Sequence, residues 1–281
     1  MRRILRVVSA LIIWSIAVIS TVDDGDAAEH VYKGVPKYSG QYGGTLKILP
    51  NIGYEAGYSE FYEDPLWSAY HIKWVPNATS PPRPKRFIAD DRTDSRLTHD
   101  DYTQSDYFTN PRALDRGHMT PNFAIGSRFG ADAQRETFFM SNICPQRATL
   151  NEQTWKYLEQ VVANTYSHEF EEVWVVVGPI FNKKAHPNRL KGKASIPDAF
   201  YMIVLNETND GHGHKEPSVL AVVMNQDVQG SQPLKKYVKT VDYVEQKTGL
   251  DFFYELDDNI ENPLEASSPD ESWELHQVLT E

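Results

Sequence analysis

Four consecutive residues, Asp115-Arg116-Gly117-His118, bring together side chains that could act on a phosphodiester. The imidazole of His118 has an ordinary pKa near neutrality, so its neutral form can take a proton from water. The guanidinium of Arg116 stays charged and can contact two phosphate oxygens at once. Gly117 permits a close backbone approach, and Asp115 could orient either neighbour. A surface turn with a solvated histidine would use the same residue types, so these four residues do not establish a site.

A second group of polar residues lies at the start of a predicted helix. Apolar residues recur at helical spacing after residue 150, at Trp155, Leu158, Val162 and Tyr166. This pattern places Asn151 in the first helical turn. Asn151 and Glu159 are about 80° apart around an α-helix, so both can face one side. Their amide and carboxylate oxygens are ligands that suit Mg²⁺, although a helix cap and a solvated helix face are the simpler explanations for each residue alone.

As an ordered set, these residues resemble the DNA/RNA non-specific endonuclease family, the ββα-metal nucleases that include endonuclease G. The resemblance covers roughly residues 60 to 255. It rests on Asp115–His118, Ser141–Ile143 with Pro145-Gln146, Asn151 with Trp155 and Glu159, Val177–Phe181, Ile196–Phe200 and Thr248–Phe253. It implies a ββα-metal nuclease fold, in which helices flank a central mixed or antiparallel sheet.

The resemblance also implies an activity, the hydrolysis of phosphodiester bonds in DNA and RNA to 5′-phosphate products. Neutral His118 would remove a proton from the attacking water. Asn151 and several waters would hold one Mg²⁺, for which Mn²⁺ can substitute. Glu159 would orient water at the metal, and Asn142 would support the site from an adjacent strand.

Two arginines are expected to neutralise the transition state, Arg116 and Arg86. The family carries an arginine before the Asp-Arg-Gly-His run at about the spacing of Arg86. Arg83, Lys85 and Arg92 lie close enough in sequence to compete for this assignment. The family also often carries an arginine four residues after the helical glutamate, where this chain has Ala163, so phosphate binding on that side must be weaker or must come from elsewhere.

The remaining segments predict an α+β fold. Three apolar runs rich in β-branched residues read as strands, at 173–177, 199–205 and 218–224, and a fourth short buried strand is expected at 138–143. A helix is predicted over 235–247, ending at Gly249, and Pro81–Pro84 predicts a loop. Strands and helices do not alternate as regular βαβ units, which favours α+β.

The ends of the chain differ from its middle. Residues 1–28 carry a basic head and an apolar run, the layout of a signal peptide or an uncleaved N-terminal anchor. We therefore expect export, periplasmic or secreted, with stable membrane association only if this segment is retained. Residues 29–255 would form the nuclease domain, and residues 256–281 an acidic, flexible tail. Cys144 is the only cysteine, so no intramolecular disulfide can form.

The formal net charge of −11 argues at first against a polyanion substrate. However, ten acidic residues and no lysine or arginine lie between Asp251 and Glu281, and the middle of the chain is close to neutral. A basic segment in that middle part contains no acid, and we expect it to bind substrate through Lys183, Lys184, Arg189, Lys191 and Lys193. A solvated basic loop is the alternative.

Two other functions have to be weighed against the nuclease. The first is a catalytically weak, nucleic-acid-binding relative, which the joint presence of His118, Asn151 and Glu159 disfavours. The second is an unrelated exported metallohydrolase that would use His212 and His214, but no third ligand lies nearby at a suitable spacing. The sequence does not decide between DNA and RNA, between single and double strands, or between a monomer and a homodimer.

Overall fold

The computed structural model of this chain describes residues 30–40, 42–103, 114–191, 193–209, 215–229 and 232–273. The expected signal peptide or anchor at 1–28 lies outside this range, as do His212, His214 and residues 274–281. Among the residues that are described, no helix has both the length and the apolar character needed to cross a bilayer.

In the described part of the chain, seven strands form an antiparallel sheet in the order β10-β9-β8-β7-β4-β3-β2. Their bounds are Lys47–Pro50 (β2), Glu55–Ser59 (β3), Asp64–Lys73 (β4), Glu172–Ile180 (β7), Ala199–Asn209 (β8), Lys215–Asn225 (β9) and Val238–Lys239 (β10). A separate antiparallel hairpin pairs β5 (Leu114–His118) with β6 (Ile143–Arg147), and β1 (Lys37–Tyr38) pairs with β11 (Leu250–Asp251).

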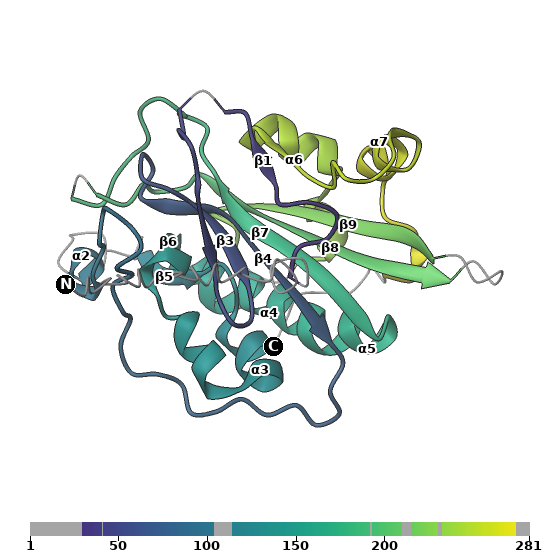
Figure 1. Cartoon of the computed structure of the whole chain (residues 1–281), viewed down its shortest axis with the longest axis horizontal. Helices are drawn as coiled ribbons and strands as arrows, with labels where there is room; N and C mark the ends of the chain where they lie inside the picture. The colour runs from purple at the N-terminus through teal and green to yellow at the C-terminus, as the bar shows by residue number, and fades with distance from the viewer. Residues whose placement is uncertain are drawn as a thin grey trace, which may run out of the picture.

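Helices cover the two faces of this sheet, as Figure 1 shows, with α3, α4 and α5 below it and α6 and α7 above it. Their bounds are Asn122–Glu136 (α3), Lys156–Gln160 (α4), Ser167–Glu169 (α5), Val241–Thr248 (α6) and Asp258–Ala266 (α7), with α2 at His99–Thr103. Two π-helical segments, Leu150–Trp155 and Val161–Tyr166, extend α4 at both ends. Three 3-10 turns lie at Met140–Asn142, Leu234–Tyr237 and Glu271–Trp273.

Strand β7 shows why both faces are covered. Val173, Val175 and Val177 belong to the core beneath the sheet, whereas Val176 and Ile180 belong to the core above it. Alternate side chains point to opposite faces of a strand, so a continuous apolar run needs a layer on each side. The prediction of a central strand buried on both faces is confirmed, as are the strands over 199–205 and 218–224.

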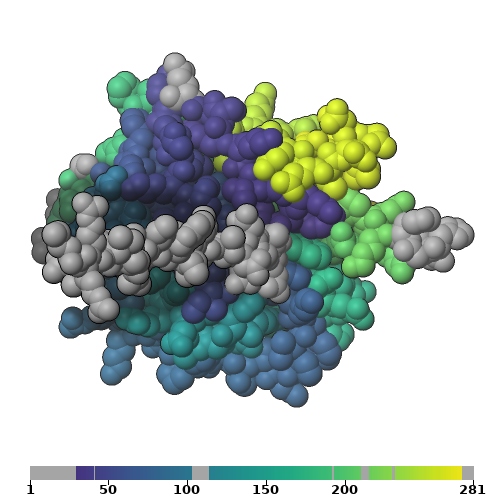
Figure 2. Space-filling view, viewed as in Figure 1, coloured from purple at the N-terminus to yellow at the C-terminus, as the bar shows by residue number. Residues whose placement is uncertain are grey.

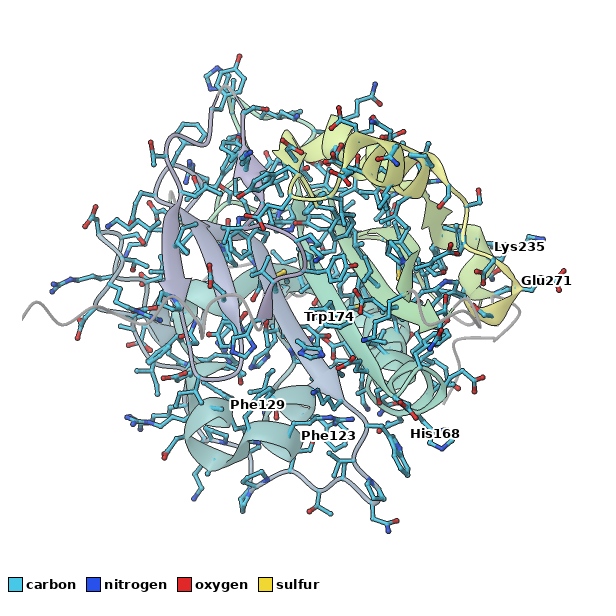
Figure 3. All side chains as sticks on the ribbon, turned by 45° about the vertical axis from the view of Figure 1, so that its right-hand side comes forward. Phe123, Phe129, His168, Trp174, Lys235 and Glu271 are labelled. Carbon is cyan, nitrogen blue, oxygen red and sulfur yellow. The ribbon has the colours of Figure 1, made fainter. Side chains whose placement is uncertain are left out.

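The lower layer comes mainly from the helix predicted after residue 150, whose Trp155, Leu158 and Val162 are buried against the sheet. Phe123 and Phe129 of α3 pack against the same core, and Figure 3 labels them at α3, below the strands. The site residues of this helix are therefore held by a large apolar contact on its opposite side.

Two predictions of secondary structure need correction. Residues 138–143 do not form a strand: Met140–Asn142 is a 3-10 turn, and the strand begins at Ile143. The helix predicted over 235–247 begins only at Val241, because 234–237 forms a 3-10 turn and Val238–Lys239 adds the edge strand β10. Its end was predicted correctly, at Gly249, which has φ 81°.

The tail expected to be flexible from residue 256 is folded as far as Trp273, so that boundary is wrong. Leu264 of α7 is buried above the sheet, and Trp273 is buried below it, where its carbonyl accepts a bond of 2.8 Å from the Tyr166 hydroxyl. Figure 2 shows the C-terminal residues lying beside the N-terminal residues on the surface, in agreement with the β1–β11 pairing. The acidic composition of this segment led us to expect a solvated, flexible end. In the fold, the buried side chains of Leu264 and Trp273 hold the segment against the two cores, and Phe252 is buried just before it.

Candidate active site

The β5–β6 hairpin carries the Asp-Arg-Gly-His run, which is a strand and not a surface turn. Gly117 pairs with Cys144, and Asp115 with Gln146. A Cβ atom at Gly117 would lie 2.4 Å from Oε1 of Gln146. This contact explains the glycine, because the hairpin brings a buried glutamine side chain across its backbone.

Asn142 fixes the backbone that follows His118. Its Oδ1 accepts a bond from the Thr120 amide at 2.9 Å, and its Nδ2 donates to the Thr120 carbonyl at 3.0 Å. The Thr120 hydroxyl lies 2.6 Å from the Ser68 hydroxyl on β4. Asn142 is fully buried, so it positions the end of β5 against the central sheet and does not reach the substrate.

His118 lies between two phenylalanine rings, with ring centroids 5.3 Å from Phe87 and 4.9 Å from Phe138. The side chain is 8% exposed, and Nε2 has no hydrogen-bond partner among the described residues. Burial, with a smaller effect from the Arg83 guanidinium, lowers the pKa of His118 to about 3. The imidazole is therefore neutral at pH 7 and retains a lone pair for a proton.

Asn151 lies in the first π-helical segment, one residue after its start. Its Nδ2 donates a bond of 2.9 Å to Oδ2 of Asp115. A carboxylate can only accept, so it selects the amide nitrogen and leaves the amide oxygen on the other side. Asp115 thus orients a metal-type ligand across the gap between hairpin and helix, a pairing that the sequence did not predict.

These residues line a cleft of about 1200 Å³ between the hairpin, the start of α3 and the long helix. His118, Arg116, Asn151 and Glu159 all line it, so the structure brings the predicted centre together. The remaining lining residues are Arg83, Pro121, Asn122, Phe123, Ala124, Glu152, Gln153, Lys156, Tyr157, Gln160, Ala163 and Asn164. A cleft of this size and polarity can admit a nucleic-acid strand.

Ionisable groups in this cleft are buried with few hydrogen-bond or ion-pair partners among the described residues. Nε and Nη1 of Arg116 are buried without hydrogen-bond partners in the described structure, and burial lowers the pKa of this guanidinium. Burial raises the pKa of Glu159 to about 8, against an opposing effect of Arg83. Buried unpaired charges cost free energy, so the cleft as built is suited to receive an ionic ligand.

Arg83 was not chosen from the sequence, yet it lines the cleft and influences both His118 and Glu159. Arg86 is exposed and is not among the lining residues; its charge acts on His99. Arg92 is held by Asp90, with bonds of 2.9 and 2.8 Å. The flanking prolines Pro82 and Pro84 were a signal for Arg83, since each fixes the backbone next to it.

The basic segment 183–193 does not reach the cleft. Arg189 donates to the carbonyls of Lys193 and Phe61, and Lys193 pairs with Asp101 at 2.5 Å. Lys184 faces a small separate cavity beside Lys247. Lys183 and Lys191 are exposed, and neither lines the cleft. That this segment binds substrate stays a prediction, and such binding would lie outside the cleft, because none of its five basic residues lines it.

Ala163, at the position where the family resemblance led us to expect an arginine, also lies on the cleft wall. The Ala163 carbonyl accepts bonds from Arg128 of α3 and from the Ser167 hydroxyl at 2.7 Å. The cationic side chains that line the cleft in place of that arginine are Arg83 and Lys156.

The residues fit a single hard divalent cation. Asn151 offers an oriented amide oxygen, and Glu159 adds a carboxyl on the same cleft wall. All of these donors are oxygens, which suits Mg²⁺ with retained waters and does not suit a thiolate or imidazole metal.

Known proteins resemble this chain over most of its length. Nuclease EXOG, mitochondrial, of Xenopus laevis is 29% identical over 198 residues, which cover 66% of this chain and 49% of that protein. Nuclease 1, mitochondrial, of Schizosaccharomyces pombe is 26% identical, covering 83% and 72%, and a nuclease of Nostoc is 29% identical, covering 71% and 70%. The chain therefore matches only about half the length of the Xenopus protein.

The fold agrees with these relatives. A crystal structure of EndoG in complex with EndoGI superposes with a TM-score of 0.62 at 21% identity, covering 78% of this chain and 90% of that one. The fold is thus that of the ββα-metal nucleases, with β5, β6 and the following helix as the ββα unit. The sequence profile of the DNA/RNA non-specific endonucleases matches residues 33–259. This chain belongs to the DNA/RNA non-specific endonuclease family.

Proposed function

We propose that this nuclease hydrolyses phosphodiester bonds in DNA and RNA with His118 as general base and one Mg²⁺ at Asn151. The observation that carries the proposal is a neutral imidazole, whose Nε2 has no hydrogen-bond partner among the described residues, in the same cleft as an amide that a carboxylate has oriented. Mn²⁺ has the same preference for oxygen ligands and should substitute.

In this mechanism the imidazole of His118 takes a proton from water as the water oxygen attacks phosphorus. The bond to the 3′ oxygen breaks, which leaves a 5′-phosphate product. Arg116 and Arg83 contact the phosphate oxygens and neutralise the charge that builds on them. Bound Mg²⁺ would polarise the phosphate and stabilise the charge on the leaving oxygen. Glu159 orients water beside Asn151, and Asp115 holds Asn151 in place.

Export remains part of the proposal, supported by the basic head and apolar run of residues 1–28. The hypothesis of an unrelated metallohydrolase built on His212 and His214 is wrong, because family membership assigns the chain to a nuclease family.

A nicking assay tests the proposal directly. Supercoiled plasmid should be nicked with Mg²⁺ or Mn²⁺ and should stay intact with excess chelator. DNA ligase should reseal the first nicks without a kinase, because a 5′-phosphate and a 3′-hydroxyl remain. Nicks that need prior kinase treatment would contradict the assigned bond cleavage, and nicking at full rate in chelator would contradict the metal.

A further inference from the structure

A second set of oxygen ligands lies between α6 and α7, on the face of the sheet opposite the cleft (Figure 1). Asp242 stands in the first turn of α6, Glu245 lies about one turn later, and Glu265 lies in the last turn of α7. One carboxylate oxygen from each residue lies within 4.8 Å of the other two. The fold therefore brings three carboxylates from two helices close enough together to bind one cation.

Glu265 is the unusual member of this set. It is 6% exposed, and its Oε1 has no hydrogen-bond partner among the residues described. Glu245 is better satisfied, since its Oε1 accepts a bond of 2.8 Å from the Phe252 amide. The Glu265 carboxyl also interacts with that of Glu245, but its Oε1 stays buried and unpartnered among the described residues. A buried oxygen without a partner is costly, so Glu265 points to a ligand that completes the site.

Further acidic residues around this cluster add to the repulsion that a bound ligand would have to offset. Asp251 and Glu261 also face the cluster and act on it through their charges. No lysine or arginine forms an ion pair with Asp242, Glu245 or Glu265 within the described structure. Burial and the neighbouring carboxylates raise the pKa of both Glu245 and Glu265. Either protons or a cation must offset the repulsion between these groups.

The ligand set distinguishes between cations. All the donors are oxygens, which excludes soft metals. The donors come from two separate helices and from both exposed and buried positions, so a strict octahedron is not imposed. Ca²⁺ accepts irregular coordination by 6–8 oxygens, whereas Mg²⁺ demands a near-ideal octahedron.

We propose that Asp242, Glu245 and Glu265 bind a Ca²⁺ ion that joins α7 to α6 and stabilises the C-terminal segment. This site is structural and is separate from the catalytic cleft, because the two lie on opposite faces of the sheet. Binding to the folded state alone raises the melting temperature by mass action.

Thermal unfolding of the full chain, freed of metal with chelator, tests the proposal. Adding Ca²⁺ to ten times its dissociation constant should raise the melting temperature by about 3–6 °C, and calorimetric titration should show one binding event that the cluster variants lack. Mg²⁺ at the same concentration should give a smaller rise. The Asn151→Ala variant should respond as the wild type does, which separates this site from the metal proposed in the cleft.

The variants assign the response to the cluster. Glu265→Gln removes a buried carboxylate ligand and Asp242→Asn an exposed one, and both should fold but lose the Ca²⁺ response. Glu271→Gln removes one charge from the same C-terminal region outside the cluster and should keep it. A wild type with no rise and no binding heat would overturn the proposal, as would an undiminished rise in both cluster variants.

Discussion

The cleft and the 183–193 loop both carry clustered positive charge, but the charges are held differently. In the cleft, Arg116 has buried nitrogens without partners among the described residues. In the loop, Arg189 donates to two backbone carbonyls and Lys193 pairs with Asp101. Basic residues in the loop therefore stabilise the fold through bonds to protein atoms, whereas Arg116 in the cleft keeps nitrogens that can bind a ligand.

The difference shows that the count of charges in a segment is a poor guide to a binding site. A charge that is already paired gains little from a new anion, whereas a desolvated, unpaired guanidinium gains the full interaction. Function in this nuclease should consequently depend on the cleft, and the loop should matter mainly for stability.

The largest difference in kcat is expected between substitutions of two histidines, His118 in the cleft and His186 in the loop. His118→Ala should lower kcat by about 10²–10⁴-fold because the general base is lost. His186→Ala, in the exposed part of the loop, should leave kcat unchanged. Mg²⁺-dependent cleavage of a labelled duplex gives both rates. Wild-type turnover in His118→Ala, with an unchanged melting temperature, would disprove the assignment.

The two arginines should differ in kind. Arg116→Ala should lower kcat by about 10²–10³-fold, since it removes a preorganised donor to the transition state. Arg189→Ala should lower the melting temperature with little effect on kcat, because its bonds are to backbone carbonyls. Rates and thermal unfolding of both variants check this. If Arg189→Ala lost more turnover than Arg116→Ala, the comparison between the regions would fail.

The metal requirement should change with Asn151 and with its partner. Asn151→Ala should raise the Mg²⁺ concentration for half-maximal activity most, because the proposed ligand is gone. Asp115→Asn should raise it by about 10-fold or more, as expected for a group that orients a ligand. Asn164→Ala, another amide on the cleft wall, is the control. Mg²⁺ titrations that coincide for Asn151→Ala and Asn164→Ala would rule out the ligand role.

The pH dependence of Mg²⁺ binding should follow Glu159. Its pKa is raised to about 8, so below that pH the carboxyl is neutral and attracts the cation less. Mg²⁺ affinity should thus increase as pH rises through about 8, and the increase should vanish in Glu159→Gln. Because the pKa of His118 is lowered to about 3, no loss of activity should appear near pH 6.5 when Mg²⁺ is saturating at each pH. An activity limb there would show that His118 titrates normally.

The smallest effect is expected for the loop lysines. Changing Lys183, Lys184, Lys191 and Lys193 together to glutamine should alter the slope of log K against log[salt] by less than about 0.9, the contribution of one phosphate on duplex DNA. Lys156→Gln alone should change it more, because Lys156 lines the cleft. Fluorescence anisotropy in Ca²⁺ measures both. A large change in the quadruple variant would place the duplex across the loop.

The grouping of the candidate site residues in one cleft was predictable because these residues are close together in the sequence. Asp115 to His118 lie on one strand, and Asn151 and Glu159 on one helix, so short patterns identify them. The π-helical segments around α4 were not predictable, since apolar spacing does not separate α from π helices over so short a run. Arg83 was considered only as an alternative to Arg86, because the choice between them depends on which residue of the proline-containing loop lines the cleft.

The C-terminal segment and the 183–193 loop were also predicted poorly, because their positions depend on residues far away in the sequence. Acidic composition suggested a flexible end, but Leu264 and Trp273 pack into cores built by residues far away in sequence. The pairing of Lys193 with Asp101 joins residues 92 positions apart. Composition describes what a segment can tolerate, whereas burial and pairing depend on partners that only the folded chain brings near.

The buried position of Trp273 beneath the sheet has a consequence for the order of folding during synthesis. Its carbonyl bonds Tyr166 across 107 positions, at the end of the helix that carries Asn151 and Glu159. During synthesis this contact can form only after residue 273 has left the ribosome. Contacts of such long separation form slowly, so the helix that carries Asn151 and Glu159 gains this support late in folding. Until then, one end of that helix lacks its contact with the C-terminal segment.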